Sequence, residues 1–339
     1  MPSPSGPTLT STQLAELAGH RFIGGTYRIA HWENWLLTDC TQRDPLPDAL
    51  VHPIALFHVP LLGSGAPITE LFRLIGASGP GSVSLLGYDW EYLQPLREDL
   101  EYRCIGHIAD AVRSTADDGR VADEFTFRFE LLDDDIGVAV VTNRWRLNHM
   151  TEQPTHRGGP AVRRDGAVED LTDGIALPEW TIESVDPARM KTMAAILRDP
   201  YPVHWDRAAN AQIGLGGRVV NQGPLNVGYI ANMLMAWAGP TCVRRLTLAF
   251  GRPVLDGDRV TAGGRVLNDD DPAGLSCAVW LERGGARIVT GTALVDTTRV
   301  PATTPGPTPS APTSSAPTTE APTTQAPTTE ASTAEDTTA

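Results

Sequence analysis

The stretch GLGGRVVNQGPLNVGYIANMLMAW, residues 214–237, joins a glycine-rich approach to an almost wholly apolar segment. A helix that is apolar on every side is stable only when it is buried. We therefore predict a buried helix that begins near Gly223. Its first amides lack partners within the helix and carry partial positive charge, which suits a carbonyl oxygen that gains negative charge during a reaction. A phosphate loop is the rival interpretation, but neither GxxxxGK[ST] nor GxGxxG after a strand is present.

A second informative stretch precedes this helix. Asp186-Pro187 is a suitable start for a helix that runs to Arg198. DPYPVHWD, residues 199–206, then places two prolines within three residues, which predicts an extended, irregular course. Asp199 and His204 lie five residues apart on this stiffened segment. We expect the carboxylate and the imidazole to face one pocket, where such a pair can position and deprotonate a water molecule.

Period-2 alternation predicts two sets of antiparallel strands with the same order of elements in each half of the chain. YLQPLRED, residues 92–99, and FGRPVLDGD, residues 250–258, both lead from an aromatic strand end through a proline and an acidic turn into the next strand. A duplicated α+β unit is the prediction. The expected strands are residues 87–92, 101–112, 123–131 and 138–147 in the first set, and 244–250, 259–267, 275–282 and 287–296 in the second.

These motifs resemble those of the MaoC-like (R)-specific enoyl-CoA hydratases and dehydratases. The resemblance rests on Asp199-x-x-Pro202-x-His204-x-Asp206, on a glycine 19 residues beyond the histidine that opens a buried helix, and on the strand with FGRPVLDGD. GYDWEYLQPLRED, residues 87–99, resembles the dehydratase-like hot-dog domain often fused ahead of that unit. The resemblance covers about residues 15–298.

The resemblance implies an α+β double hot-dog, in which each unit wraps a curved antiparallel sheet around a long helix. The domains expected are an N-terminal dehydratase-like hot-dog at 15–150, a linker at 151–180, a C-terminal MaoC-like hot-dog at 181–300 and a disordered Pro/Thr/Ala-rich tail at 301–339. The implied activity is reversible addition of water to a trans-2-enoyl thioester of CoA or acyl carrier protein, giving the 3-hydroxyacyl thioester, within fatty acid or polyketide metabolism.

Carried over to this sequence, Asp199 and His204 are the expected catalytic pair, and the Gly223 amide polarises the thioester carbonyl. No metal and no cofactor beyond the CoA or phosphopantetheine of the substrate is expected. Tyr201 stands where the family usually has Asn, and Gln222 where many members have His. Both are expected to contact substrate, with Asn226 and Tyr229 as weaker candidates for lining the pocket.

Other residues have structural interpretations. Asp206 is expected to fix its loop by accepting backbone amides. Asp48, His52 and His58 in the first half lack the proline-stiffened spacing of the second half, so that half is expected to line an acyl tunnel. Four aromatic residues, Trp32, Trp35, Phe57 and Phe72, are expected to be lining or core. Since Lys191 is the only lysine, an arginine is the expected contact for a substrate phosphate.

Composition limits the partners and the location. The net charge of −14 argues against a protein that binds nucleic acid or anionic membranes. Four widely spaced cysteines favour neither a zinc site nor a disulfide framework. The N-terminal residues lack the pattern of a secretory signal, and the longest apolar stretch is too short to span a bilayer, so a cytoplasmic location is expected. Nothing in the catalytic interpretation needs the tail.

Two alternatives to the hydratase remain open on sequence grounds. A hot-dog thioesterase would share the fold and the thioester but cleave it with water. A non-catalytic acyl-binding partner subunit of a dehydratase complex would also fit the departures at Tyr201 and Gln222. The oligomeric state is left open between a homodimer and an association with another hot-dog chain.

Overall fold

The computed structural model describes residues 9–115, 121–148, 174–267 and 274–296. We call residues 9–148 the first half and 174–296 the second half. Most of the expected linker and all of the expected tail lie outside the described residues, and the predicted domain boundaries stay predictions. The helices are α1 (Ser11–Leu17), α2 (His31–Cys40), η1 (Pro53–Leu56), α3 (His58–Gly63), α4 (Ile68–Ile75), α5 (Pro187–Leu197), η2 (Pro202–His204), α6 (Arg207–Gln212) and α7 (Gly223–Ala238).

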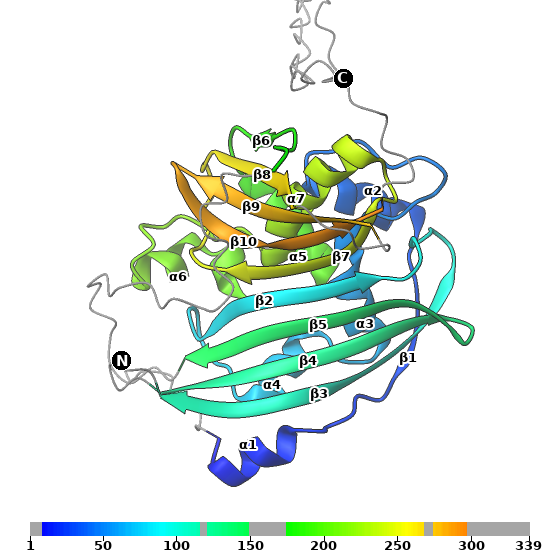
Figure 1. The fold of residues 1–339 in the computed structure, drawn as a ribbon. Coiled ribbons are helices and arrows are strands. Elements are labelled where there is room, and N and C mark those ends of the chain that lie inside the picture. The colour runs from blue at the N-terminus through cyan, green and yellow to red at the C-terminus, as the bar shows by residue number, and fades with distance from the viewer. Residues whose placement is uncertain (1–8, 116–120, 149–173, 268–273, 297–339) are drawn as a thin grey trace, which may run out of the picture. The chain divides into compact units, whose positions relative to one another are not determined.

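All described strands form one antiparallel sheet, in the order β1-β3-β4-β5-β2-β7-β10-β9-β8-β6. The two halves of this order correspond strand for strand, which confirms the predicted repetition. Figure 1 shows the strands in front and helices α3, α4, α5 and α7 behind them. The strands are β1 (Gly25–Arg28), β2 (Val83–Tyr92), β3 (Glu101–Thr115), β4 (Val121–Asp133), β5 (Ile136–Asn148), β6 (Trp180–Ile182), β7 (Val243–Phe250), β8 (Val260–Val266), β9 (Leu275–Arg283) and β10 (Ala286–Val295).

The alternating sequence pattern correctly predicted the eight longer strands, β2–β5 and β7–β10. Along β4, buried and partly exposed positions alternate, so that Phe125, Phe127 and Phe129 all face the core. The short strands β1 and β6 were not predicted, because three or four residues are too few to establish a period. The sheet and the helices that it covers form the predicted hot-dog architecture.

Strands β2 and β7 join the two halves. They pair antiparallel from Gly87 opposite Ala249 to Glu91 opposite Arg245. The Arg245 guanidinium donates to both carboxylate oxygens of Asp89 across this pair, at 2.8 and 2.6 Å. The joint between the halves is therefore a continuous part of the sheet.

The central helices of the two halves also meet. Helix α7 is almost entirely buried, as predicted, whereas the corresponding element of the first half is the interrupted pair η1 and α3. A Cβ on Gly228 would lie 2.7 Å from Thr41 Cγ2 and 3.4 Å from Ile54 Cγ2, so the lack of a side chain allows this close approach. Asn232 of α7 adds a polar link, because its amide donates to the Thr41 carbonyl at 3.0 Å and its carbonyl oxygen lies 3.0 Å from His52 Nε2.

One prediction about the first half is wrong. Trp32 and Trp35 are 63% and 47% exposed, and neither lies in the core or the cavity. Helix α2 buries Asn34 and Leu37 on its inner side, and the two tryptophans fall on the opposite side of the helical turn.

Within the described residues, no single helix is long and apolar enough to cross a bilayer. One pair of segments, Pro53–Gly63 and Ile68–Ile75, passes the same test only when taken together across a 65° bend.

Candidate functional site

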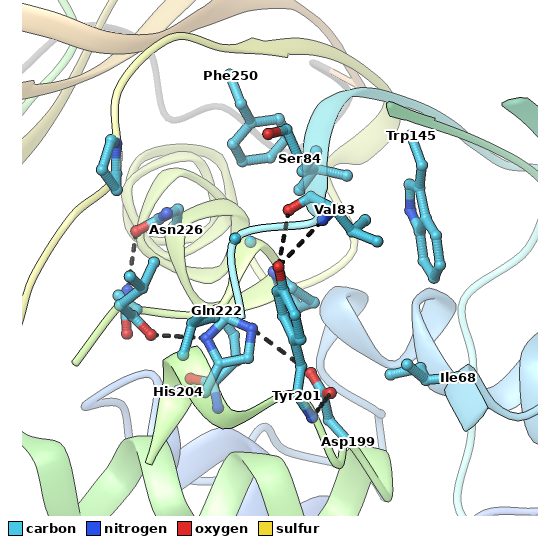
Figure 2. Close-up of a pocket in the computed structure, with 18 of the residues that line it drawn as sticks. Ile68, Val83, Ser84, Trp145, Asp199, Tyr201, His204, Gln222, Asn226 and Phe250 are labelled. Carbon is cyan, nitrogen blue, oxygen red and sulfur yellow. Dashed lines mark hydrogen bonds and ion pairs between the residues drawn. The ribbon is translucent and has the colours of Figure 1, made fainter. Parts of the chain in front are cut away.

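A cavity of about 330 Å³ lies where the two halves meet. Its walls are mostly apolar, and both halves contribute to them (Figure 2). Phe57 and Phe72 are in its lining, as predicted. The first half supplies Phe57, Ile68, Phe72, Gly81, Val83, Ser84, Leu85, Tyr88 and Trp145, and the second half supplies Leu197, Asp199, Tyr201, Val203, His204, Ile213, Leu215, Val220, Asn221, Gln222, Gly223, Pro224, Asn226, Phe250, Gly251, Arg252 and Pro253.

Asp199 reaches the cavity because helix α5 ends just before it. Asp186 caps the start of α5, as predicted, and Arg198 ends the helix in the left-handed conformation. The Asp199 N–H then donates to the Ala194 carbonyl at 2.9 Å. One carboxylate oxygen, Oδ1, accepts the Tyr201 N–H at 2.9 Å. The backbone and one oxygen of this residue are thus fixed, and Oδ2 is left for other interactions.

His204 lies on η2, opposite Asp199. Its Nδ1 is 2.7 Å from the Val220 carbonyl oxygen. Since a carbonyl only accepts, Nδ1 carries the proton, and in the neutral ring Nε2 is the basic nitrogen. Nε2 lies 3.6 Å from Asp199 Oδ2, and the side chains of the pair are only 13% and 8% exposed. The predicted juxtaposition of the two groups is present (Figure 2).

The surroundings of the pair change the acidity of its carboxyl group. Burial raises the pKa of the Asp199 carboxyl above its usual value, against the opposing effects of His204 and the Tyr201 N–H. A protonated Asp199 can donate a proton, and the unprotonated Nε2 of a neutral His204 can accept one. The two groups together can therefore both accept and supply a proton during a reaction.

Gly223 is the first residue of α7, and its N–H makes no hydrogen bond with the described part of the chain. It lines the same cavity as the Asp199–His204 pair. A Cβ here would lie 2.3 Å from Leu85 Cδ2 and 3.0 Å from Tyr88 Oη. Only glycine therefore fits without displacing the opposite wall. The exposed amide at the start of a 16-residue helix is suited to hold a developing negative charge.

Of the four other residues predicted to contact substrate, three line the cavity and one does not. Tyr201 lines the cavity, but its hydroxyl accepts the Val83 N–H at 3.1 Å and donates to the Val83 carbonyl at 3.3 Å. Gln222 also lines it, while its amide donates to the Met190 carbonyl at 2.7 Å. Asn226 lines it and accepts from Asn221. Tyr229 is buried in the core and is not among the lining residues.

Asp206 and Arg252 complete the surroundings. The prediction for Asp206 is confirmed, because its carboxylate accepts the N–H groups of Ala208 and Ala209 and caps α6. Arg252 lines the cavity, is exposed, and makes no hydrogen bond or ion pair with the described residues. Among those residues, no group of three or more His, Cys, Asp or Glu side chains is arranged to hold a metal ion.

Tyr88 is a cavity residue that the sequence analysis did not name. Tyr88 stands on β2 of the first half and reaches the Gly223 end of the cavity. It sits at an alternating strand position, which predicts only that it faces inward. Its proximity to Gly223 depends on how the two halves pack, for which the local sequence carries no signal.

Comparisons with known proteins agree with this architecture. A structure described as a MaoC-like dehydratase has 18% sequence identity and a TM-score of 0.62, and the match covers 84% of this chain and all of the other. A Mycobacterium tuberculosis protein described as a double hot-dog fold has 15% identity and a TM-score of 0.55, with 87% and 100% covered. A putative oleoyl thioesterase from Lactobacillus plantarum has 12% identity and a TM-score of 0.50, with 84% and 98% covered.

No protein with a curated description matches this sequence. The family model for the MaoC like domain matches residues 176–276, the segment that contains Asp199, His204 and Gly223. The resemblance to the MaoC-like family, which was inferred from the motifs, thus agrees with the family match. The strand order agrees with a double hot-dog fold. Residues 176–276 therefore form a MaoC-like domain, and the chain that carries it has a double hot-dog fold.

Proposed function

We propose that this protein is an acyl-thioester hydratase or dehydratase that adds water reversibly to a trans-2-enoyl thioester. The observation that carries the proposal is the buried Asp199–His204 pair in the same cavity as the free Gly223 N–H. A proton-transfer pair and an amide for a developing oxyanion are the groups that hydration of an enoyl thioester requires. The MaoC-like domain supports the same reaction class.

In the proposed hydration, the neutral His204 accepts a proton at Nε2 from a water molecule whose oxygen bonds to C3 of the substrate. The electron pair of the C2=C3 bond moves toward the thioester, and the carbonyl oxygen gains negative charge beside the Gly223 N–H. Protonated Asp199 then supplies the proton that bonds to C2. Transfer of the proton from His204 to Asp199, across 3.6 Å, restores the starting pair. Dehydration follows the same steps in reverse.

The substrate is expected to enter with its acyl group among the apolar side chains of the cavity. Arg252 is the best-placed cation for a phosphate of CoA or of a phosphopantetheine arm, because it lines the cavity and lacks an ion-pair partner among the described residues. No metal or redox cofactor takes part in the proposed reaction. Association with a second copy or another hot-dog chain, and a cytoplasmic location, also remain predictions.

The test is hydration of crotonyl-CoA, followed by loss of enoyl absorbance and by the mass of the product. Asp199→Asn and His204→Ala are each expected to lower kcat by at least about 100-fold. Asp206→Asn is the matched control, because it changes a carboxylate in the same loop while Asn still caps α6. Unchanged turnover in both Asp199→Asn and His204→Ala would contradict the assignment.

A thioesterase is the second candidate, and the similarity to the Lactobacillus plantarum structure is the observation that favours it. The same pair and the same amide would then direct water to the thioester carbonyl carbon. Release of free thiol from crotonyl-CoA or butyryl-CoA, without a hydrated product, would favour thioester cleavage over hydration.

A further inference from the structure

Tyr88 is held rigidly in the cavity wall that belongs to the first half. Its side chain is 1% exposed, and its ring stacks on Trp90 with centroids 4.6 Å apart and planes 20° apart. The Phe250 ring packs edge-on against the Tyr88 ring with centroids 5.1 Å apart, and the centroid of the tilted Phe57 ring lies 5.8 Å away. A ring enclosed by three aromatic side chains has little freedom to move, so the position of its hydroxyl is defined.

The hydroxyl of Tyr88 makes no hydrogen bond with the described part of the chain. Buried tyrosine hydroxyls normally find a partner, because an unmet hydrogen bond in the interior is costly. Three other buried tyrosines of this protein follow that rule. Tyr92 donates to the Pro53 carbonyl, and Tyr102 and Tyr201 bond main-chain atoms. Tyr88 lines the cavity instead, where a bound molecule is the available partner.

The hydroxyl lies beside the free amide of Gly223. A Cβ built on Gly223 would be 3.0 Å from Tyr88 Oη, and that Cβ shares its Cα with the amide nitrogen. The two donors therefore lie close together at one end of the cavity, one from β2 of the first half and one from α7 of the second half.

Tyr88 remains a donor at any ordinary pH. Burial raises the pKa of its hydroxyl well above the usual value, and the nearby charge of Asp199 raises it further. Tyr88 lines the same cavity as Asp199 and His204. A neutral hydroxyl can donate to an oxyanion without giving up its proton.

We propose that Tyr88 is a catalytic residue that donates a second hydrogen bond to the thioester carbonyl oxygen, in addition to the bond from the Gly223 N–H. This inference rests on the proposed function. As water adds at C3, the electron pair of the C2=C3 bond moves to the carbonyl oxygen, where both donors stabilise the negative charge. When C2 takes its proton, the pair returns and the carbonyl re-forms. Tyr88 keeps its own proton throughout, and the first half thereby contributes to the chemistry.

The test compares wild type with Tyr88→Phe, which preserves the stacked ring and removes only the hydroxyl. Loss of one oxyanion donor predicts a fall in kcat of about 100-fold or more for crotonyl-CoA, with KM changed by less than about threefold. Tyr92→Phe is the control, because Tyr92 lies outside the lining of this cavity and its hydroxyl bonds a main-chain carbonyl. It is expected to leave kcat unchanged. Urea unfolding of each variant verifies that it is folded.

A second measurement separates this inference from the proposed function. Butyryl-CoA labelled with carbon-13 at the carbonyl cannot be hydrated, and its carbonyl stretch reports hydrogen bonding when it is bound. The band is expected to move to higher frequency in Tyr88→Phe and to stay in place in Tyr92→Phe. If wild type binds butyryl-CoA but hydrates nothing, the proposed function fails while the band still decides whether Tyr88 contacts the carbonyl. Equal bands and equal kcat in wild type and Tyr88→Phe would overturn the inference.

Discussion

The hydroxyl of Tyr201 ties the Asp199 loop to the first half, and removing it tests whether this contact supports the fold or the substrate. Tyr201 Oη accepts the Val83 N–H at 3.1 Å and donates to the Val83 carbonyl at 3.3 Å. At about 1 kcal/mol for each bond, Tyr201→Phe should lower the free energy of unfolding by about 2 kcal/mol. The ring retains its edge contacts with Phe72 and His204 in this variant.

Tyr102→Phe is a matched control for stability. The Tyr102 hydroxyl accepts the Arg97 N–H at 2.8 Å and donates to the Arg97 carbonyl at 3.3 Å, and it lies outside the cavity lining. Urea unfolding followed by tryptophan fluorescence should show similar losses in the two variants. Only Tyr201→Phe is expected to lower kcat, by up to about 100-fold, because the segment that carries Asp199 loses its anchor.

Two results would refute this reasoning. If Tyr201→Phe unfolds within about 0.5 kcal/mol of wild type while Tyr102→Phe loses about 2 kcal/mol, the bonds to Val83 contribute little to stability. If Tyr201→Phe raises KM for crotonyl-CoA without any loss of stability, the hydroxyl binds substrate, as the sequence analysis predicted for this residue.

Three further predictions concern the Asp199–His204 pair and Gly223. Because burial raises the pKa of Asp199, its ionised form is less favourable in the folded than in the unfolded chain; Asp199→Asn should therefore raise the free energy of unfolding at pH 7, a gain that disappears as the pH falls toward about 4 in urea titrations. Hydration as proposed starts from a protonated Asp199, whose pKa is raised by burial, so kcat/KM should fall as the pH rises and Asp199 loses its proton; a kcat/KM that does not change with rising pH would contradict the mechanism. Gly223→Ala places a Cβ 2.3 Å from Leu85 Cδ2 and 3.0 Å from Tyr88 Oη, and should cost about 1–3 kcal/mol of stability and also lower kcat; wild-type stability and activity in this variant would contradict the close fit between Gly223 and the opposite wall.

Much of the candidate site was predictable because its signals are local. The two prolines around Tyr201 end α5 and stiffen the segment, so the five-residue spacing of Asp199 and His204 already indicated that they meet. The apolar run after Gly223 similarly indicated a buried helix with a free amide at its start. Each inference depends on residues within a few turns of one another, where backbone geometry limits the outcomes.

The errors and omissions arise where residues far apart in the sequence meet. Tyr201 lines the cavity, and the sequence did not indicate that its hydroxyl is bonded to Val83, 118 residues earlier. The prediction that Trp32 and Trp35 are lining or core failed because the aromatic composition of α2 does not reveal which side of the helix packs on α5. Tyr88 was missed because its role depends on the distance between β2 and the start of α7.

The sequence alone determined the elements of this protein: the alternating strands, the capped helix before Asp199, the buried helix after Gly223 and the pairing of Asp199 with His204. These follow from periodicity, proline geometry and short spacings, which act within a single segment. Only the tertiary structure decided that the sheets of both halves merge through β2 and β7 and that one cavity draws its walls from each. The physical reason is that packing between distant segments is fixed by the fit of whole surfaces, such as Gly228 against Thr41 and Gly223 against Tyr88.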